Sequence, residues 1–307
     1  MSAMPRIRIR LSLIAALAAA LLITGPHALT STAATTSSPL QSPSRPTRIV
    51  SLIPAVTEIL FAMGAASQVV AVSSFDEYPP EVKQLPRVGA LLDPDLERIL
   101  ALRPDLVIVY DSQADFRLQL ERAKVPSYVY KHAGLAGVFE TIKLVGARVG
   151  RTTEAAALSG RISADLDRIR ARVKGRPRPS TLLVFGRDAL ALRGIYASGG
   201  FGFLNDMLSI AGGENLFADV KRESVQATSE LILARRPEVI VELRAGALSE
   251  SMRAKEIAVW AALPGVPAVR NGRITMVNDE RTMVPGPRVA EGTELIARVL
   301  HPEAFSK

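Results

Sequence analysis

Stretches with the apolar pattern of buried strands alternate with stretches of helical periodicity along most of the chain. Residues 106–110 form a continuous apolar run, and 49–52 and 125–130 have a similar pattern. Strands that are apolar on both sides are typical of a parallel sheet covered by helices on both faces. Helices are predicted between them at 54–63, ended by a glycine, and at 95–102, ended by an Arg-Pro pair. The other predicted elements are strands at 69–73, 181–185, 238–243 and 273–277, and helices at 203–211 and within 286–300.

One predicted helix is longer than the rest. From Thr153 to Val173 apolar residues recur at spacings near three, four and seven, and glycine and prolines at 175–179 end the pattern. At 1.5 Å per residue this helix is ~30 Å long, about the diameter of a small domain. The alternation of strands and helices restarts after it. We therefore expect a bridging helix at 151–175 between an N-terminal lobe (48–150) and a C-terminal lobe (176–307).

The two lobes share an internal repeat. Residues 97–108 (ERILALRPDLVI) and 230–241 (ELILARRPEVIV) align without a gap. Each copy is a predicted helix whose Arg-Pro exit leads into a buried strand. A repeat of this kind indicates two lobes of the same type. The predicted fold class is therefore α/β, with two Rossmann-like lobes of mainly parallel sheets bridged by one long α-helix.

The first 33 residues have the three parts of a secretory signal peptide. Three arginines between residues 6 and 10 form the charged region, 11–23 form a short apolar region, and 31–33 supply small residues for cleavage after Ala33 or Ala34. A membrane anchor is the alternative, but the apolar run is shorter than the ~20 residues that a spanning helix needs. Residues 34–47, rich in Ser, Thr and Pro, are expected to form a mobile linker. The chain has no cysteine to carry a lipid, so we expect a periplasmic protein that is not embedded in the membrane.

Composition argues against several kinds of function. Of the 307 residues, 48% are hydrophobic and 22% charged, enough for one large or two moderate cores. The net charge is +8, the leader contributes three of these charges, and no basic run interleaved with aromatic residues points to nucleic acid. Without cysteine there can be no disulfide or thiolate metal site, and His27, His132 and His301 are too scattered to predict a metal cluster. We expect no metal site and no resident cofactor.

Signatures of catalysis are missing as well. The sequence contains no Gly-x-Ser-x-Gly elbow, zinc signature or phosphate loop. His132 has no evident nucleophile partner, and Ser198 has no assigned base. We therefore expect no catalytic residue and no enzyme activity, with a secreted α/β enzyme as the alternative class.

Several short motifs follow one another in a specific order and spacing. In this order they resemble the periplasmic binding proteins for vitamin B12, ferric siderophores and haem, the class III type with a single backbone helix. Ser73-Ser74-Phe75 before Tyr78-Pro79-Pro80 brings the chain closest to the cobalamin branch. The resemblance extends from Arg48 to Pro302, and its other motifs are RIVSLIPAVTE at 48–58, PRVG at 86–89, DPDLE at 93–97, LRPD at 102–105, AGGENLF at 211–217 and PGPR at 285–288.

The resemblance implies the substrate-binding component of an ABC importer. Such a protein captures cobalamin or a related corrinoid between its lobes and delivers it, as a monomer, to a permease dimer with its ATPase subunits. A ferric siderophore or haem is the alternative ligand. One glutamate on each lobe would pair with arginines of the permease, and by motif these are Glu97 and Glu230. Asp95 and Thr228 are good N-cap residues, which would place both glutamates in the first turn of a helix, where a carboxylate is also favourable for the helix itself.

The ligand cleft is expected where loops at the carboxyl ends of both sheets meet. Aromatic rings can pack on a flat macrocycle, and a charged pair can bind side amides or a phosphate. The chain departs from the cobalamin branch because its single tryptophan, Trp260, falls late in the second lobe, and Leu91 and Ser224 stand where that branch often has cleft tryptophans. By motif position the predicted ligand-binding residues are Phe75, Leu91, Tyr196, Phe201, Asp279 and Arg281.

Overall fold

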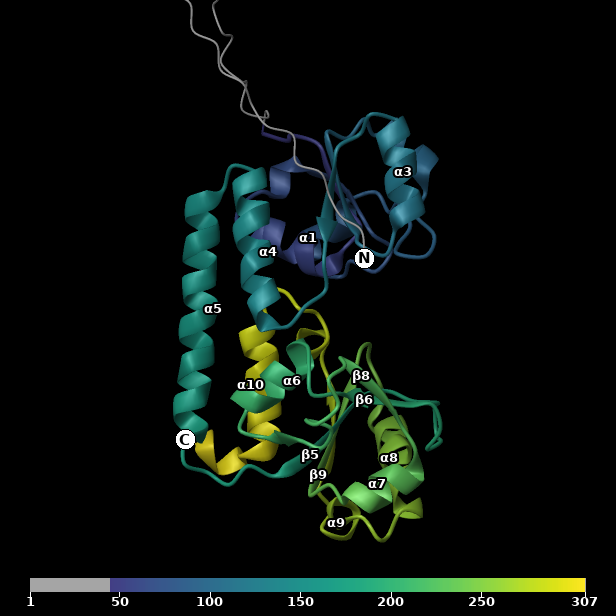
Figure 1. Ribbon diagram of the computed structural model, residues 1–307, viewed down its shortest axis with the longest axis vertical. Coiled ribbons are helices and arrows are strands. Elements are labelled where there is room, and N and C mark those ends of the chain that lie inside the picture. The colour runs from purple at the N-terminus through teal and green to yellow at the C-terminus, as the bar shows by residue number, and fades with distance from the viewer. Residues whose placement is uncertain (1–44, 307) are drawn as a thin grey trace, which may run out of the picture. The chain divides into compact units, whose positions relative to one another are not determined.

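The computed structural model describes residues 45–306 (Figure 1). The predicted signal peptide (1–33) and residues 34–44 of the predicted linker lie outside this range. The last linker residues are held against the body of the protein. Pro46 is buried, and the backbone N and the hydroxyl of Thr47 donate to the Asp105 carboxylate at 2.7 and 2.9 Å.

The N-terminal lobe is built on a four-stranded, fully parallel sheet of order β2-β1-β3-β4. Side chains of its central strands alternate between two cores, as Val107 and Val109 pack with α2 and α3 whereas Leu106 and Ile108 pack with α1 and α4. This two-sided burial explains the continuous apolar run at 106–110. The elements are β1 (Ile49–Ser51), α1 (Pro54–Ala62), β2 (Val69–Val72), α2 (Leu96–Ala101), β3 (Leu106–Tyr110), α3 (Ala114–Arg122), β4 (Ser127–Tyr130) and α4 (Leu135–Arg148).

The C-terminal lobe has a mixed sheet of order β10-β9-β5-β6-β8, with β7 paired to β5. Strands β10, β9 and β5 are parallel, as predicted from their apolar runs, whereas β6 and β8 are antiparallel additions that the sequence pattern did not reveal. The elements are β5 (Ser180–Gly186), β6 (Ile195–Ser198), α6 (Phe203–Ile210), β7 (Glu214–Asn215), β8 (Ser224–Ala227), α7 (Ser229–Arg235), β9 (Val239–Arg244), α8 (Glu250–Ala258), α9 (Pro267–Arg270), β10 (Ile274–Asn278) and α10 (Val289–Leu300).

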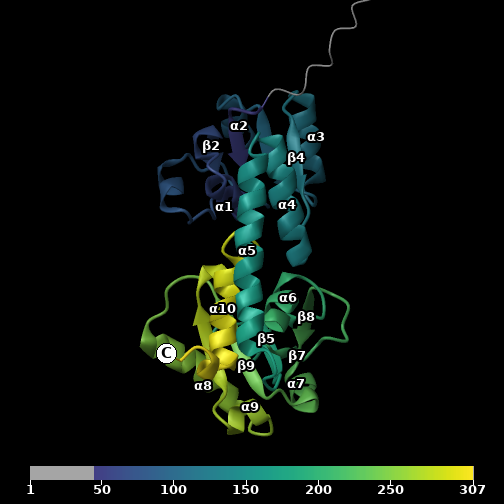
Figure 2. The ribbon, with the colours of Figure 1, turned by 90° about the vertical axis from the view of Figure 1, so that its left-hand side faces the viewer.

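A single 22-residue helix, α5 (Thr152–Val173), connects the lobes (Figure 2). It packs on α4 in the N-terminal lobe and on α10 and α6 in the C-terminal lobe. Its buried stripe runs from Ala155 through Ile162 to Val173, so both lobes share one continuous apolar core along it. The predicted fold of two α/β lobes bridged by one long helix is confirmed, and the helix begins one residue earlier than expected.

The internal repeat is also a structural repeat. Asp95 and Thr228 cap α2 and α7 by accepting hydrogen bonds from the backbone N of Arg98 and Leu231. At equivalent positions Ile99 and Ile232 are fully buried. The arginines that follow the two helices, 103 and 236, both adopt left-handed backbone conformations, with φ of 48° and 53°. In both lobes the chain therefore passes from the helix to the following strand through the same tight turn.

Within residues 45–306, no helix is both long enough and apolar enough to cross a membrane.

Candidate functional site

A cavity of about 300 Å³ lies where the two lobes meet. The N-terminal lobe contributes His132, which follows β4, and the C-terminal lobe contributes the rest of the lining. Three phenylalanines make its wall largely apolar, and Glu223 is the acidic residue of the lining. An aromatic cavity with a few polar groups is a typical small-molecule site. The complete lining is His132, Phe185, Phe201, Gly202, Phe203, Leu204, Glu223, Ser224 and Met283.

The predicted aromatic residues are exposed, as a ligand contact requires. Phe201 lines the cavity and is 59% exposed. Tyr196 is 45% exposed, and its ring lies 6.5 Å from that of Phe185 in the cavity wall. Phe75, at 72%, and Leu91, at 39%, lie on loops of the N-terminal lobe and are not among the residues that line this cavity. Of these four residues, the structure thus places Phe201 and Tyr196 in or beside the cavity wall, and Phe75 and Leu91 outside its lining.

Asp279 and Arg281 form an ion pair with each other. Arg281 donates from Nε and Nη2 to the two Asp279 oxygens at 2.8 and 2.6 Å, and from Nη1 to Glu291 at 3.0 Å. These hydrogen bonds lower the pKa of Asp279 below its usual value. Neither residue lines the cavity, so contact with a ligand stays a prediction for both.

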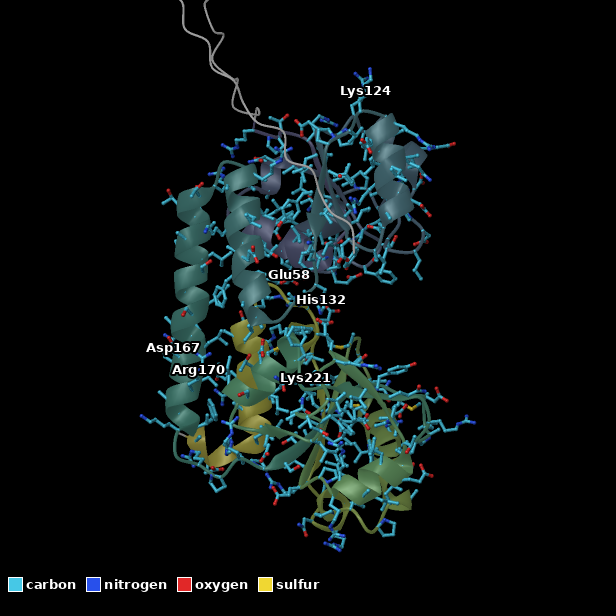
Figure 3. The ribbon with its side chains drawn as sticks, viewed as in Figure 1. Glu58, Lys124, His132, Asp167, Arg170 and Lys221 are labelled. Carbon is cyan, nitrogen blue, oxygen red and sulfur yellow. The ribbon has the colours of Figure 1, made fainter. Side chains whose placement is uncertain are left out.

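His132 is a cavity residue that the sequence did not single out for ligand binding. Its ring lies edge-on to Phe203, with centroids 5.6 Å apart, and its Nε2 is 3.7 Å from the Glu223 carboxylate. Nδ1 is 3.4 Å from the hydroxyl of Tyr130. Figure 3 shows His132 at the junction of the lobes. The local sequence gave no sign of this contact, because Phe203 and Glu223 lie in the other lobe.

A buried ion pair also joins the lobes. Arg288, just before α10, donates from Nε and Nη2 to Glu58 on α1 at 2.9 and 2.5 Å, and its guanidinium lies 3.8 Å from the centre of the Tyr78 ring. The two side chains are 15% and 3% exposed, and burial raises the pKa of Glu58 despite the opposing effect of Arg288. Figure 3 places Glu58 at the inter-lobe junction.

A third contact links the start of α4 to α6. The Asp206 carboxylate accepts a hydrogen bond from the backbone N of Leu135 at 2.9 Å. A carboxylate at a helix N-terminus is favourable because it satisfies a free N–H and meets the positive end of the helix dipole. Together with the Glu58–Arg288 ion pair and the 3.7 Å approach of His132 to Glu223, it makes three polar contacts between the lobes within residues 45–306.

Comparison with known proteins identifies the family. Residues 49–280 match the family model described as periplasmic binding protein. The chain belongs to the periplasmic binding protein family. It is 30% identical over 267 residues to an uncharacterised ABC transporter substrate-binding lipoprotein of Bacillus subtilis, covering 85% of this chain and 82% of that protein.

Two further comparisons concern relatives with named ligands. Over 196 residues, 63% of this periplasmic binding protein, the chain is 28% identical to the vitamin B12-binding protein of Yersinia pestis, covering 68% of that protein. The periplasmic haem-binding protein RhuT of a Roseiflexus species is 26% identical, with a TM-score of 0.71, covering 84% of this chain and 98% of that one.

The tryptophan of this periplasmic binding protein lies in a core, outside the cleft. Trp260 is fully buried and donates its indole N–H to Glu242. Glu242 also receives Arg187 Nε at 2.9 Å, and Arg187 pairs with Glu256 at 2.8 Å. Because it is fully buried within this network, the tryptophan is unavailable to a ligand.

The two motif glutamates are on the surface of the periplasmic binding protein. Glu97 and Glu230 are both exposed, and each is the second residue of its helix. Neither forms an ion pair within the described part of the chain. Its own backbone N–H and the Thr228 hydroxyl lower the pKa of Glu230. Both caps predicted from Asp95 and Thr228 are present.

No group of three or more histidine, cysteine, aspartate or glutamate side chains in residues 45–306 could hold a metal ion. Ser198, which the sequence left without a base, is buried and donates to the Gly199 carbonyl at 3.0 Å.

Proposed function

We propose that this protein is the exported, periplasmic substrate-binding component of an ABC importer, and that it captures cobalamin or a related corrinoid between its lobes. The observation that carries this proposal is the aromatic cavity at the lobe junction, formed by a chain that belongs to the periplasmic binding protein family. The similarity to a vitamin B12-binding protein supports the choice of ligand.

The ligand would be held mainly by apolar contact. Phe75 on one lobe and Phe201 on the other are 72% and 59% exposed, and covering such rings with a macrocycle removes apolar surface from water. Leu91 and Tyr196 would extend this surface. Asp279 and Arg281 would meet polar groups at the ligand edge, through the donor and acceptor capacity that their mutual pair leaves free.

Haem or a ferric siderophore is the second candidate ligand. Haem is favoured by the similarity to a haem-binding protein over 84% of the chain. Tyr196 is 45% exposed beside the cavity wall, and a phenolate is a known haem-iron ligand.

Titration calorimetry of the mature chain against cyanocobalamin, a ferric hydroxamate and haemin tests the ligand. We expect cyanocobalamin to bind and Phe201→Ala to weaken that binding by about tenfold, the effect of losing roughly 1.4 kcal/mol of contact. Leu118→Ala, at a residue of α3 that is 51% exposed, is the matched control and should bind normally. If only haemin or only the hydroxamate binds, that chelate takes the place of cobalamin as the proposed ligand. Turnover of a substrate without binding of any chelate would favour the enzyme class.

Delivery would depend on Glu97 and Glu230. Each carboxylate would pair with an arginine of one permease subunit, and two separated charged contacts fix orientation as well as attraction. Glu97→Ala and Glu230→Ala should leave ligand affinity unchanged and weaken binding to the permease–ATPase complex. A loss of ligand affinity in both variants would instead make them cleft residues.

A further inference from the structure

Within residues 45–306, His132 is the one residue of the cavity lining whose side chain carries nitrogen. It follows β4 and so lies at the carboxyl end of the N-terminal sheet, the edge at which parallel α/β sheets bind their ligands. Its side chain is 38% exposed, and Figure 3 places it where the lobes meet. The apolar contacts proposed above leave this imidazole without a role.

The imidazole ring is held between aromatic rings of both lobes. The Phe203 ring centroid lies 5.6 Å away with the planes at 88°, and the Tyr130 centroid lies 6.4 Å away with the planes at 66°. The Tyr130 hydroxyl is 3.4 Å from Nδ1 of His132. Burial raises the pKa of Tyr130, so this hydroxyl stays neutral and can accept a hydrogen bond from Nδ1. The ring is therefore oriented from its Nδ1 side.

The other ring nitrogen, Nε2, is left available to a ligand. The Glu223 carboxylate is 3.7 Å from it, which is longer than a hydrogen bond, and Nε2 has no hydrogen-bond partner among the side chains of the described range. When Nδ1 donates to a partner, Nε2 carries the lone pair, and metal-bound histidines are commonly oriented in this way. His132 therefore presents an unsatisfied nitrogen donor at the cavity wall.

We propose that Nε2 of His132 binds the metal centre of the captured chelate, and that the ligand is a planar metal macrocycle with an exchangeable axial position. This inference rests on the proposed function and narrows its ligand. Aquo-corrinoid cobalt and ferric haem iron share this chemistry, and an imidazole nitrogen suits both. The nitrogen donates its lone pair to the metal as the axial water leaves. One metal–nitrogen bond thus replaces one metal–oxygen bond, and the oxidation state of the metal does not change.

The alternative role for His132 is a weak ion pair with Glu223 that only connects the lobes. Such a pair would affect every ligand that occupies the cleft in the same way, whatever its axial group. Coordination instead separates aquocobalamin from cyanocobalamin, because the first carries an exchangeable water where the second carries a tightly held cyanide. The difference in affinity between these two corrinoids is therefore a measurement that a purely structural role would not change.

Titration and absorption spectroscopy of the mature chain with aquocobalamin, cyanocobalamin and haemin test the proposal. The native chain should bind aquocobalamin at least about tenfold more tightly than cyanocobalamin, since losing even an outer partner of a metal ligand costs that much. Bound aquocobalamin or bound haemin should also show the spectrum that each has with free imidazole, and this comparison distinguishes cobalt from iron as the metal. His132→Phe keeps a ring for packing but has no nitrogen, so it should abolish the affinity difference and the spectral change.

Three further variants act as controls. His301 is the other histidine beyond the predicted signal peptide, it is 4% exposed with Nε2 3.2 Å from the Gly212 carbonyl, and His301→Gln should retain the spectral change. Glu223→Gln and Tyr196→Phe alter groups at or beside the cavity without removing the imidazole. Their affinities can change, but the imidazole spectrum should remain. Thermal melting checks the folding of each variant, and His132→Gln replaces His132→Phe if the larger ring disturbs it.

The results separate this inference from the proposed function. The inference is wrong if aquocobalamin and haemin bind with unaltered spectra, or if the spectral change persists without His132. It is also wrong if the change is lost only in Tyr196→Phe, which would make the phenolate the ligand. If only a ferric hydroxamate binds, the metal has no exchangeable position, so the inference fails while the transport function stands. If none of these chelates binds, the proposed function itself fails.

Discussion

Removing Arg288 from its buried pair with Glu58 should destabilise the protein more than breaking any surface ion pair. Replacing Arg288 by Met removes both hydrogen bonds to Glu58 but keeps an apolar chain that can lie on the Tyr78 ring. Glu58 is then left 3% exposed and without its cation. The perturbation therefore isolates the charge contact between the lobes.

The expected loss follows from burial. Removing one member of a buried pair costs about 3–5 kcal/mol, because the other charge is left uncompensated. Arg288 is 15% exposed, and Glu58 can respond by binding a proton, so we expect the lower end, about 3 kcal/mol. For a folded body of this size that corresponds to a fall in Tm of roughly 6–12 °C.

The loss should depend on pH in a defined direction. Burial raises the pKa of Glu58 above 4.5, and Arg288 partly offsets this. A carboxyl group with a raised folded-state pKa contributes stability that is present below its unfolded value and is lost as pH rises through the folded one. Removing Arg288 removes the offset, so the variant should lose more stability at pH 8 than at pH 5.

Urea unfolding and thermal melting of Arg288→Met at pH 5 and pH 8 are the assays. Arg298→Met is the control, because Arg298 forms an exposed pair with Glu294 on α10 and should change stability by less than ~0.5 kcal/mol. The reasoning is refuted if Arg288→Met melts with the native protein, or if its deficit is equal at the two pH values.

Three other outcomes are expected. Small-angle scattering should show little compaction on ligand binding, because α5 and three polar contacts connect the lobes. A large decrease in the radius of gyration would contradict this. Trp260→Phe should destabilise the protein by about 1–3 kcal/mol in urea, because Glu242 loses a buried donor. Asp279→Asn should make the free energy of unfolding less sensitive to acid. The pKa of Asp279 is lowered in the folded protein, so its contribution to stability is present above pH 3.8 and is lost as the pH falls. An acid-unfolding profile identical to that of the native protein would argue against this.

Sequence periodicity predicted the strands that are buried on both sides and missed several elements that are mostly exposed, but it also missed α4, six of whose residues are buried. The apolar runs at 106–110 and 181–185 form central strands. They could be predicted because a strand buried on both faces has a continuous apolar sequence. Helix α3 was missed because only Phe116 and Leu120 on it are buried. Strands β6 and β8 were missed for a related reason, since they add to a sheet edge as antiparallel strands with exposed positions.

The candidate site was predicted unevenly. Exposed aromatic side chains at Phe201 and Tyr196 follow from motif position, and the structure places them in or beside the cavity wall. His132 could not be assigned to the cavity from its own neighbours, because Tyr130 and the strand before it look like core.

The sequence by itself determined two repeated lobes, the helix between them and the matched glutamates, because each depends on local periodicity and on residues close together in the chain. The tertiary structure decided which side chains meet where the lobes join. Glu58 and Arg288 are 230 residues apart, and His132 and Glu223 belong to different lobes. Both contacts depend on the packing of α5 on α4 and α10, a long-range arrangement that no local pattern encodes.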